Sequence, residues 1–189
     1  MSKLALGTVQ FGTNYGINNS VGIPNDKEIT SILDYAYKNG INTLDTAIAY
    51  GKSEERLGKL MKNNFQIISK FSGIYNFKDL ENELSKSLTQ LQVEKLYGFM
   101  FHNANDLTEN PNMWSFLEKL KVANKIQKIG FSIYNDIELS KILNLGFVPD
   151  IVQLPYSILD RRFQNSLIKL KQLGVEIHVR SVFLQGLYF

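Results

Sequence analysis

Short apolar runs alternate with amphipathic stretches along this chain, and this alternation limits the possible folds more than any other feature. Parallel neighbouring strands need a crossover connection, so one helix-length stretch between each pair of runs predicts a parallel sheet. Where such a sheet closes into a barrel, the carboxyl ends of its strands meet at one mouth. Six of the runs end in a polar residue, and we expect these residues to lie close together at that mouth: Asp45, Lys70, His102, Ser132, Gln153 and Ser181.

The pattern predicts an α/β fold, a parallel (β/α)8 TIM-type barrel with about seven of its eight units. A complete barrel of this kind typically needs about 250 residues, whereas this chain has 189. We therefore expect residues 1–189 to form a single incomplete barrel domain, truncated before its last unit. The alternative is a sheet that stays open, with unpaired edge strands. The expected strands are 4–11, 41–46, 65–70, 97–101, 129–132, 151–154 and 175–181.

Polar residues mark several expected helix starts. Asn25 with Glu28 three residues later is a capping-box pattern. Ser53 and Asn135 each precede a helical stretch and are expected to act as N-caps. Pro111 suits the start of another helix. Each of these positions therefore predicts the end of a loop that follows a strand.

Composition excludes several classes of function. The net charge is +3, and the basic residues are interspersed with acidic ones, so no nucleic-acid partner is expected. The chain has no cysteine, which excludes disulfides and thiolate metal sites, and its two histidines are too far apart in sequence to suggest a metal site. It has neither a signal-peptide pattern nor an apolar run of about 18 residues. We therefore expect a soluble, cytoplasmic protein with no membrane partner.

The alternation of side chains along the strand at 97–101 predicts where the histidine after it points. Along residues 97–102 the large aromatic side chains share one face of the strand and the others share the second face: Tyr97, Phe99 and Phe101 on the first, Gly98, Met100 and His102 on the second. Bulky aromatic side chains belong against the helices that cover a barrel. His102 is therefore expected to face the barrel interior. His178 lies in the middle of a strand, and we interpret it as structural.

Three further residues are expected beside His102. Asp45 and Lys70 end adjacent strands, roughly 4.8 Å apart, and should form an ion pair. Tyr50 lies in the loop just after Asp45, at the same mouth. A phenol loses its proton near pH 10, and a neighbouring ammonium is expected to lower that pKa.

Together these groups could give a proton to a carbonyl oxygen while hydride reaches the carbonyl carbon. Asp45 would hold Lys70 in place, and His102 would position the substrate oxygen. None of the four can supply the hydride, so a nicotinamide cofactor is implied.

The same residues carry a resemblance to a known family. Residues 40–54 resemble the signature of the aldo-keto reductase family, which places the family's aspartate and tyrosine on Asp45 and Tyr50. Residues 67–70 are similar to its lysine strand, and residues 101–103 to its histidine strand. The resemblance implies NADPH-dependent reduction of a small aldehyde or ketone, or the reverse oxidation. It makes Tyr50 the general acid, with Lys70 tuning it.

The resemblance also implies residues that bind NADPH. Ser132 and Gln153 resemble residues that hold the nicotinamide carboxamide, and Ser181 resembles the start of a loop around the pyrophosphate. Arg180 stands where many members have a tyrosine that stacks on the nicotinamide, and its planar guanidinium could also stack. The family's segment that grips the adenosine 2′-phosphate has no counterpart here. We therefore expect weak cofactor binding by these 189 residues alone.

Two alternatives remain open from the sequence. A non-catalytic barrel of this type could act as a binding or regulatory module. Barrels also host aldolases, in which a lysine such as Lys70 forms a Schiff base. Asp45 argues against the second alternative, because a neighbouring carboxylate favours a charged amine.

Overall fold

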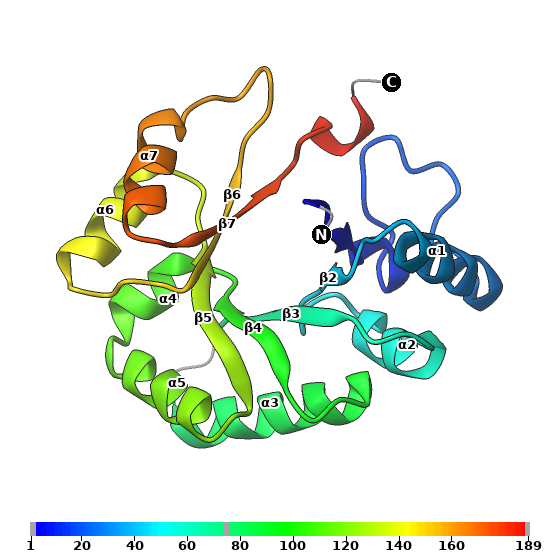
Figure 1. Ribbon diagram of the computed structural model, residues 1–189, viewed down its shortest axis with the longest axis horizontal. Coiled ribbons are helices and arrows are strands. Elements are labelled where there is room, and N and C mark those ends of the chain that lie inside the picture. The colour runs from blue at the N-terminus through cyan, green and yellow to red at the C-terminus, as the bar shows by residue number, and fades with distance from the viewer. Residues whose placement is uncertain (1–2, 74–75, 188–189) are drawn as a thin grey trace.

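The computed structural model describes residues 3–73 and 76–187. Within these ranges seven parallel strands pair in chain order in one sheet, with β1 and β7 at its two edges. The sheet is curled, and helices alternate with its strands, as Figure 1 shows. Seven units of a barrel are thus in place, which confirms the predicted fold class. The strands are β1 Leu6–Gly7, β2 Thr43–Asp45, β3 Gln66–Phe71, β4 Leu96–Phe101, β5 Ile126–Ser132, β6 Ile151–Pro155 and β7 Glu176–Arg180.

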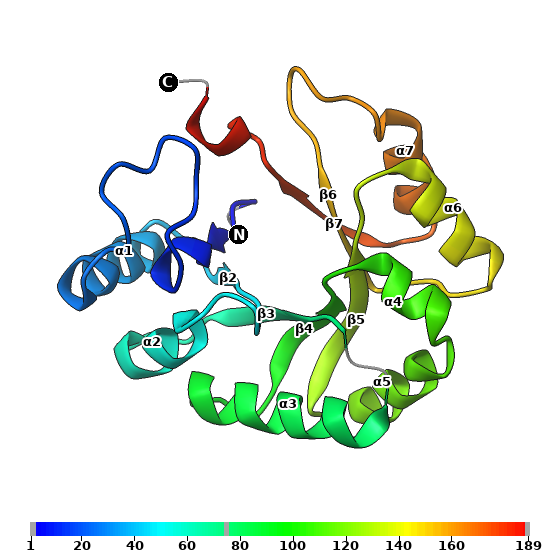
Figure 2. The ribbon, with the colours of Figure 1, turned by 180° about the vertical axis from the view of Figure 1, so that it is seen from behind.

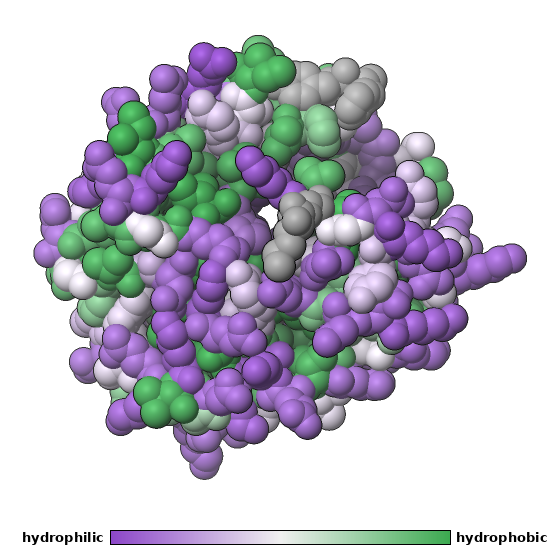
Figure 3. All heavy atoms as spheres, in the orientation of Figure 1, coloured by the Kyte–Doolittle hydropathy of each residue, from purple (hydrophilic) through white to green (hydrophobic). Residues whose placement is uncertain are grey.

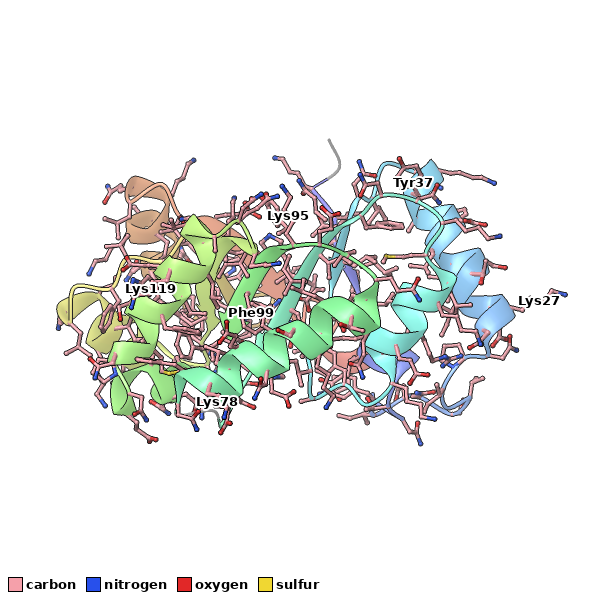
Figure 4. All side chains as sticks on the ribbon, turned by 90° about the horizontal axis from the view of Figure 1, so that it is seen from below. Lys27, Tyr37, Lys78, Lys95, Phe99 and Lys119 are labelled. Atoms are coloured by element: carbon pink, nitrogen blue, oxygen red, sulfur yellow. The ribbon has the colours of Figure 1, made fainter. Side chains whose placement is uncertain are left out.

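The helices lie on the convex side of this curled sheet (Figure 1). Their exposed lysines, such as Lys27, Lys78 and Lys119, project outward in the view of Figure 4. The helices are α1 Asp26–Lys38, α2 Ser53–Leu60, α3 Phe77–Leu91, α4 Ala104–Glu109, α5 Asn112–Val122, α6 Asp136–Asn144 and α7 Gln164–Gln172, with short 3-10 helices η1 Val9–Phe11 and η2 Leu184–Gly186.

The two faces of the sheet have separate cores. Phe99 and Phe101 are fully buried in the main core, between the strands and the helices. Met100 packs with Ile68 and Ile151 in a smaller cluster on the concave side. The alternation predicted for β4 is therefore confirmed for Phe99, Met100 and Phe101. It is wrong for Tyr97, which packs against the concave-side cluster and bonds to Glu176 of β7. The two phenylalanines fill the space under the helices and leave the concave side to smaller and polar side chains.

Several local predictions are confirmed and others are wrong. The capping box of Asn25 and Glu28 is present, and the Asn135 side chain caps α6. The first strand is much shorter than predicted, because Phe11 and Thr13 bond back to the carbonyls of residues 8 and 9 and form η1. Helix α4 was not predicted; the Asn103 side chain caps it directly after β4.

Ser53 is not the cap of α2. The N-cap position is Lys52, which makes no side-chain capping bond. Ser53 is instead the first helical residue, and its hydroxyl is fully buried against the strands. The Ser53 hydroxyl thus bonds to the carbonyl of Thr8 and does not cap the helix, and this contact cannot be predicted from sequence spacing.

The chain segments next to the two edge strands approach one another. Asn18, in the loop between β1 and α1, donates a hydrogen bond from Nδ2 to the carbonyl of Gly186, at 2.7 Å. Figure 2 shows this loop and the segment after β7 on the same side of the molecule. The face in Figure 3 has a central hollow, which lies inside the curl of the strands in Figure 1. None of the helices in the described ranges has the length and apolar character needed to cross a bilayer.

Candidate active site

A fully buried lysine forms the centre of the candidate site. Lys70 Nζ donates a hydrogen bond to Asp45 Oδ1 at 2.7 Å and another to the carbonyl of Thr46 at 2.9 Å. Gln153 Nε2, from β6, donates to the same Asp45 oxygen at 2.9 Å. The predicted ion pair between neighbouring strands is present, and an amide from the far side of the sheet also binds it.

Tyr50 reaches this ion pair through a tight turn. Its backbone N–H bonds to the carbonyl of Ala47, and the N–H of Ile48 bonds to the carbonyl of Lys70. The turn therefore continues along β3 after β2 has ended. Lys70 Nζ lies 5.5 Å from the centroid of the Tyr50 ring.

Two glycines permit this turn. A Cβ on Gly12 would lie 1.8 Å from the carbonyl oxygen of Tyr50, so the two backbones pass closer than any side chain allows. Gly51 has φ of +57°, a left-handed conformation that suits glycine, and its missing Cβ would lie 2.5 Å from the carbonyl oxygen of Gly12. The position of Tyr50 thus depends on Gly12 and Gly51.

His102 completes the group predicted from the sequence. Its ring lies edge-on to the Tyr50 ring, with centroids 5.7 Å apart and an interplanar angle of 81°. Its backbone N–H bonds to the carbonyl of Phe71 at 2.7 Å, which extends the pairing of β3 and β4 by one residue. The structure therefore brings Asp45, Tyr50, Lys70 and His102 together on the concave side of the sheet.

The pKa of Tyr50 is raised above its ordinary value, the reverse of the expected direction. Burial of the phenol is the main cause, and the Asp45 carboxylate adds to it. Sequence reasoning considered only the Lys70 ammonium. In the structure that ammonium is bound by Asp45, whose negative charge offsets it. A phenol in this environment keeps its proton at neutral pH.

The pKa of His102 is lowered. Burial of the imidazole is the main cause, and the Lys70 ammonium adds to it. The ring is therefore neutral at neutral pH and carries one N–H donor. Tyr50 and His102 thus both present neutral hydrogen-bond donors.

Of the residues expected to hold a cofactor, two are buried in the sheet and one is exposed after its last strand. Ser132, at the carboxyl end of β5, is the register partner of Gln153, in the middle of β6, and both are buried. A hydroxyl and an amide are chemically suited to bind a carboxamide, so this pair fits the group that the resemblance implies. Ser181 is exposed and has φ of +59°, just after β7.

Arg180 is already stacked on a protein side chain. Its guanidinium carbon lies 4.1 Å from the centroid of the Tyr134 ring, and it donates to the carbonyl of Ile133 at 3.2 Å. The Arg180 guanidinium could therefore stack on a nicotinamide only with the face that is turned away from Tyr134.

Sequence reasoning missed two tyrosines of this site. Tyr15 and Tyr134 lie close enough to Tyr50 to contribute to its raised pKa. Tyr134 follows the end of β5 by two residues, and Tyr50 follows the end of β2 by five. The position of Tyr134 just after a strand was thus a usable signal. Tyr15 lies in a long loop and offered none. Across residues 3–73 and 76–187, no group of three or more histidines or acidic residues could hold a metal ion.

Comparisons with known proteins identify the family of this chain. A family model described as the aldo/keto reductase family matches residues 3–189. The NADH-specific methylglyoxal reductase of Escherichia coli (strain K12) is 28% identical over 218 residues, covering 99% of this chain. The uncharacterized oxidoreductase YqkF of Bacillus subtilis (strain 168) is 25% identical over 203 residues, also covering 99% of this chain. The chain spans 65% and 62% of the lengths of these two relatives.

Solved structures show the same fold. A candidate aldo-keto reductase from Pseudomonas aeruginosa superposes with a TM-score of 0.83 and 28% identity, covering 95% of this chain and 73% of that one. The holo form of aldo-keto reductase AKR11C1 from Bacillus halodurans gives a TM-score of 0.78 over 98% of this chain and 63% of that one. The latter is 23% identical and supports the fold alone.

Proposed function

The chain belongs to the aldo/keto reductase family, and from that premise we propose that the protein is an NADPH-dependent oxidoreductase. It reduces a small aldehyde or ketone to an alcohol, or catalyses the reverse reaction. The observation that carries this proposal is the meeting of Tyr50, Lys70, Asp45 and His102 in one place, from four separate parts of the chain.

Tyr50 is the proton donor in this proposal. Its phenol gives its proton to the carbonyl oxygen as hydride arrives at the carbonyl carbon, and the alcohol forms. NADPH, when bound, supplies the hydride. The Lys70 ammonium, 5.5 Å from the centre of the phenol ring, favours the phenolate that remains. In the reverse direction the phenolate takes the proton from the alcohol.

Asp45 and His102 have supporting roles. Asp45 accepts the hydrogen bond from Lys70 and so fixes the ammonium beside Tyr50. The neutral imidazole of His102 donates a hydrogen bond to the substrate oxygen and directs it toward the phenol. The reacting oxygen is thus surrounded by one cation and two neutral hydrogen-bond donors.

The proposed cofactor contacts come from β5, β6, the end of β7 and the segment after it. Ser132 and Gln153 hold the carboxamide of the nicotinamide, and Ser181 begins the loop near the pyrophosphate. Arg180 offers the free face of its guanidinium. The choice of NADPH rests on the family resemblance, whereas the E. coli relative is described as NADH-specific. Titration of the protein with NADPH and with NADH, followed by fluorescence, tests this choice.

The two alternative functions make different demands on Lys70. A Schiff-base enzyme needs a neutral amine, whereas Lys70 donates to both a carboxylate and a backbone carbonyl. This environment supports the reductase over the aldolase. A regulatory module would bind the cofactor without turnover, and the activity of the purified protein distinguishes it.

The test is carbonyl-dependent NADPH oxidation by the purified protein and by Tyr50→Phe. Loss of the acid should lower turnover by about 100-fold or more. Tyr35→Phe is the matched control, because Tyr35 is exposed on α1 and lies outside the site. Near-normal turnover in Tyr50→Phe would refute the assignment of the acid.

A further inference from the structure

Two polar residues at the start of α2 are buried. Ser53 is 0% exposed and Glu54 is 3% exposed, although an acidic residue in the first turn of a helix usually faces solvent. They follow Tyr50 by three and four residues. Neither has a part in the proton transfer proposed above.

Ser53 attaches the Tyr50 turn to the first two strands. Its N–H bonds to the carbonyl of Tyr50 at 3.0 Å. Its hydroxyl lies 2.9 Å from the carbonyl of Thr8 and 3.2 Å from the hydroxyl of Thr46, which follows Asp45 directly. The start of α2 is therefore fixed beside Asp45.

Glu54 attaches the same helix to β3. Its Oε1 accepts a hydrogen bond from Ser69 at 2.5 Å and another from Ser87 of α3 at 2.8 Å. Ser69 immediately precedes Lys70. Because side chains alternate along a strand, Ser69 points toward the helices while Lys70 points to the concave side. The hydrogen bond between Glu54 and Ser69, on the outer face of β3, thus holds the backbone next to Lys70, whose side chain lies on the inner face.

Burial of the Glu54 carboxyl lowers the stability of the fold. Both hydrogen bonds come from neutral hydroxyls, and burial raises the pKa of the Glu54 carboxyl. A buried carboxyl of this kind is less favourable for stability than a well-packed apolar side chain. What the carboxyl provides, and an apolar side chain cannot, is a directional link between α2, β3 and α3.

We infer that Glu54 is a positioning residue, which fixes the strand segment of Lys70 relative to the turn of Tyr50 by accepting the Ser69 hydroxyl. Its consequence for turnover rests on the proposed function. Its effect on geometry does not, and can be measured in the protein without cofactor. His102 reports that geometry, because the Lys70 ammonium adds to the effect of burial in lowering the pKa of its imidazole.

The experiment is an NMR titration of the histidine imidazoles. The chain has two histidines, so their signals are easily separated. His178 serves as the internal control, and His178→Gln assigns the signals. Ser69→Ala and Ser87→Ala form a matched pair, since both remove one hydroxyl bond to the same oxygen of Glu54 and both serines are fully buried. Only Ser69 is next to Lys70.

We expect Ser69→Ala to raise the titration midpoint of His102 by roughly half a pH unit, because the ammonium moves away from the imidazole. Ser87→Ala should leave that midpoint unchanged while lowering the melting temperature similarly. Equal midpoints in Ser69→Ala and the wild type, or equal shifts in both serine variants, would overturn the inference. The serine pair decides the question even if variants of Glu54 itself fail to fold.

Substitution of Glu54 separates geometry from charge. Glu54→Gln keeps an oxygen acceptor of the same reach and should leave the titration midpoint of His102 as it is in the wild type. Glu54→Leu removes the acceptor and should behave like Ser69→Ala. A shift of the same size in Glu54→Gln would show that the carboxylate charge acts directly on His102, and would also overturn the inference.

The kinetic consequence is tested separately. Under the proposed function, Ser69→Ala should lower kcat by up to about 100-fold, with a smaller change in KM. If Tyr50→Phe leaves turnover unchanged, the proposed function fails, and the NMR titration still decides the role of Glu54. If Tyr50→Phe abolishes turnover while Ser69→Ala leaves kcat unchanged, only the positioning role fails.

Discussion

The ammonium of Lys70 lies 2.7 Å from the carboxylate of Asp45, and the lysine side chain is fully buried while the aspartate keeps 16% exposure. A buried ion pair of this kind adds little net stability, because desolvation of both charges offsets their attraction. Its value to the protein therefore lies in the fixed position of a cation at the mouth of the sheet. The pair becomes important for stability only when one partner is removed.

We expect Asp45→Asn to lower the free energy of unfolding by about 3–5 kcal/mol, since it leaves the Lys70 ammonium buried without a countercharge. The double variant Asp45→Asn with Lys70→Met should lose less than the sum of the two single variants. Urea denaturation measures all three. Lys86→Met is the control, because Lys86 is exposed in its pair with Glu83 and little change should follow. Additive losses at Asp45 and Lys70 would contradict the coupling.

Gly12→Ala tests the close approach under the Tyr50 turn. The new methyl group would lie 1.8 Å from the carbonyl oxygen of Tyr50 and 2.5 Å from the backbone nitrogen of Ser53, and neither backbone atom can move independently. We expect a loss of more than about 1 kcal/mol in unfolding free energy, together with reduced turnover. Thermal denaturation and NADPH oxidation measure the two effects.

Gly7→Ala is the control for this substitution. A methyl group at Gly7 would have no atom within 4 Å, and Gly7 lies on β1 beside Asp45. Similar losses in both variants would show that the Gly12 effect does not arise from contact with the Tyr50 turn.

Much of this site could be predicted from the sequence because it depends on strand order and side-chain alternation. Asp45 and Lys70 end neighbouring parallel strands, and the pairing follows from that alone. The inward direction of His102 follows from the aromatic residues on the opposite face of β4. Both inferences use only periodicity and the geometry of a parallel sheet.

Other features depend on neighbours that are distant in sequence, and for these the predictions failed. The pKa of Tyr50 rises because burial and Asp45 outweigh Lys70, a balance that requires all positions to be known. Ser53 is typical of an N-cap by spacing, yet its hydroxyl is bound by Thr8. Arg180 stacks on Tyr134, which no local pattern predicts.

The lowered pKa of His102 predicts a pH dependence of stability. Because the fold disfavours the imidazolium, His102 contributes no penalty above its ordinary pKa of about 6.5, and stability is lost as pH falls below that value. His102→Gln should remove this part of the loss. Urea denaturation at pH 7.5 and at successively lower pH measures it. Parallel curves for the wild type and His102→Gln would contradict the prediction.

A second polar cluster joins strands that are not neighbours in the sheet. Glu176 of β7 accepts hydrogen bonds from Tyr97 of β4, at 2.7 Å, and from Lys128 of β5, and its other oxygen lies 2.6 Å from His178 Nε2. In a flat sheet β4 and β7 would be three spacings apart, about 14 Å. The curl of the sheet brings them within reach of one carboxylate. His178 binds within this cluster, in keeping with its interpretation as structural.

This cluster predicts an acid-sensitive contribution to stability. Burial opposes ionisation of Glu176, but the hydrogen bonds from Lys128, Tyr97 and His178 outweigh it and lower the pKa to about 2. The contribution is therefore complete above the ordinary pKa of 4.5 and is lost as pH falls from there toward about 2. Glu176→Gln should be less stable than the wild type at pH 6, and the difference should shrink as pH falls through this range. Glu94→Gln, at an exposed position, should follow the wild-type curve throughout. A stability difference between wild type and Glu176→Gln that stays constant from pH 6 to pH 3 would show that the carboxylate charge does not hold β7 to the rest of the sheet.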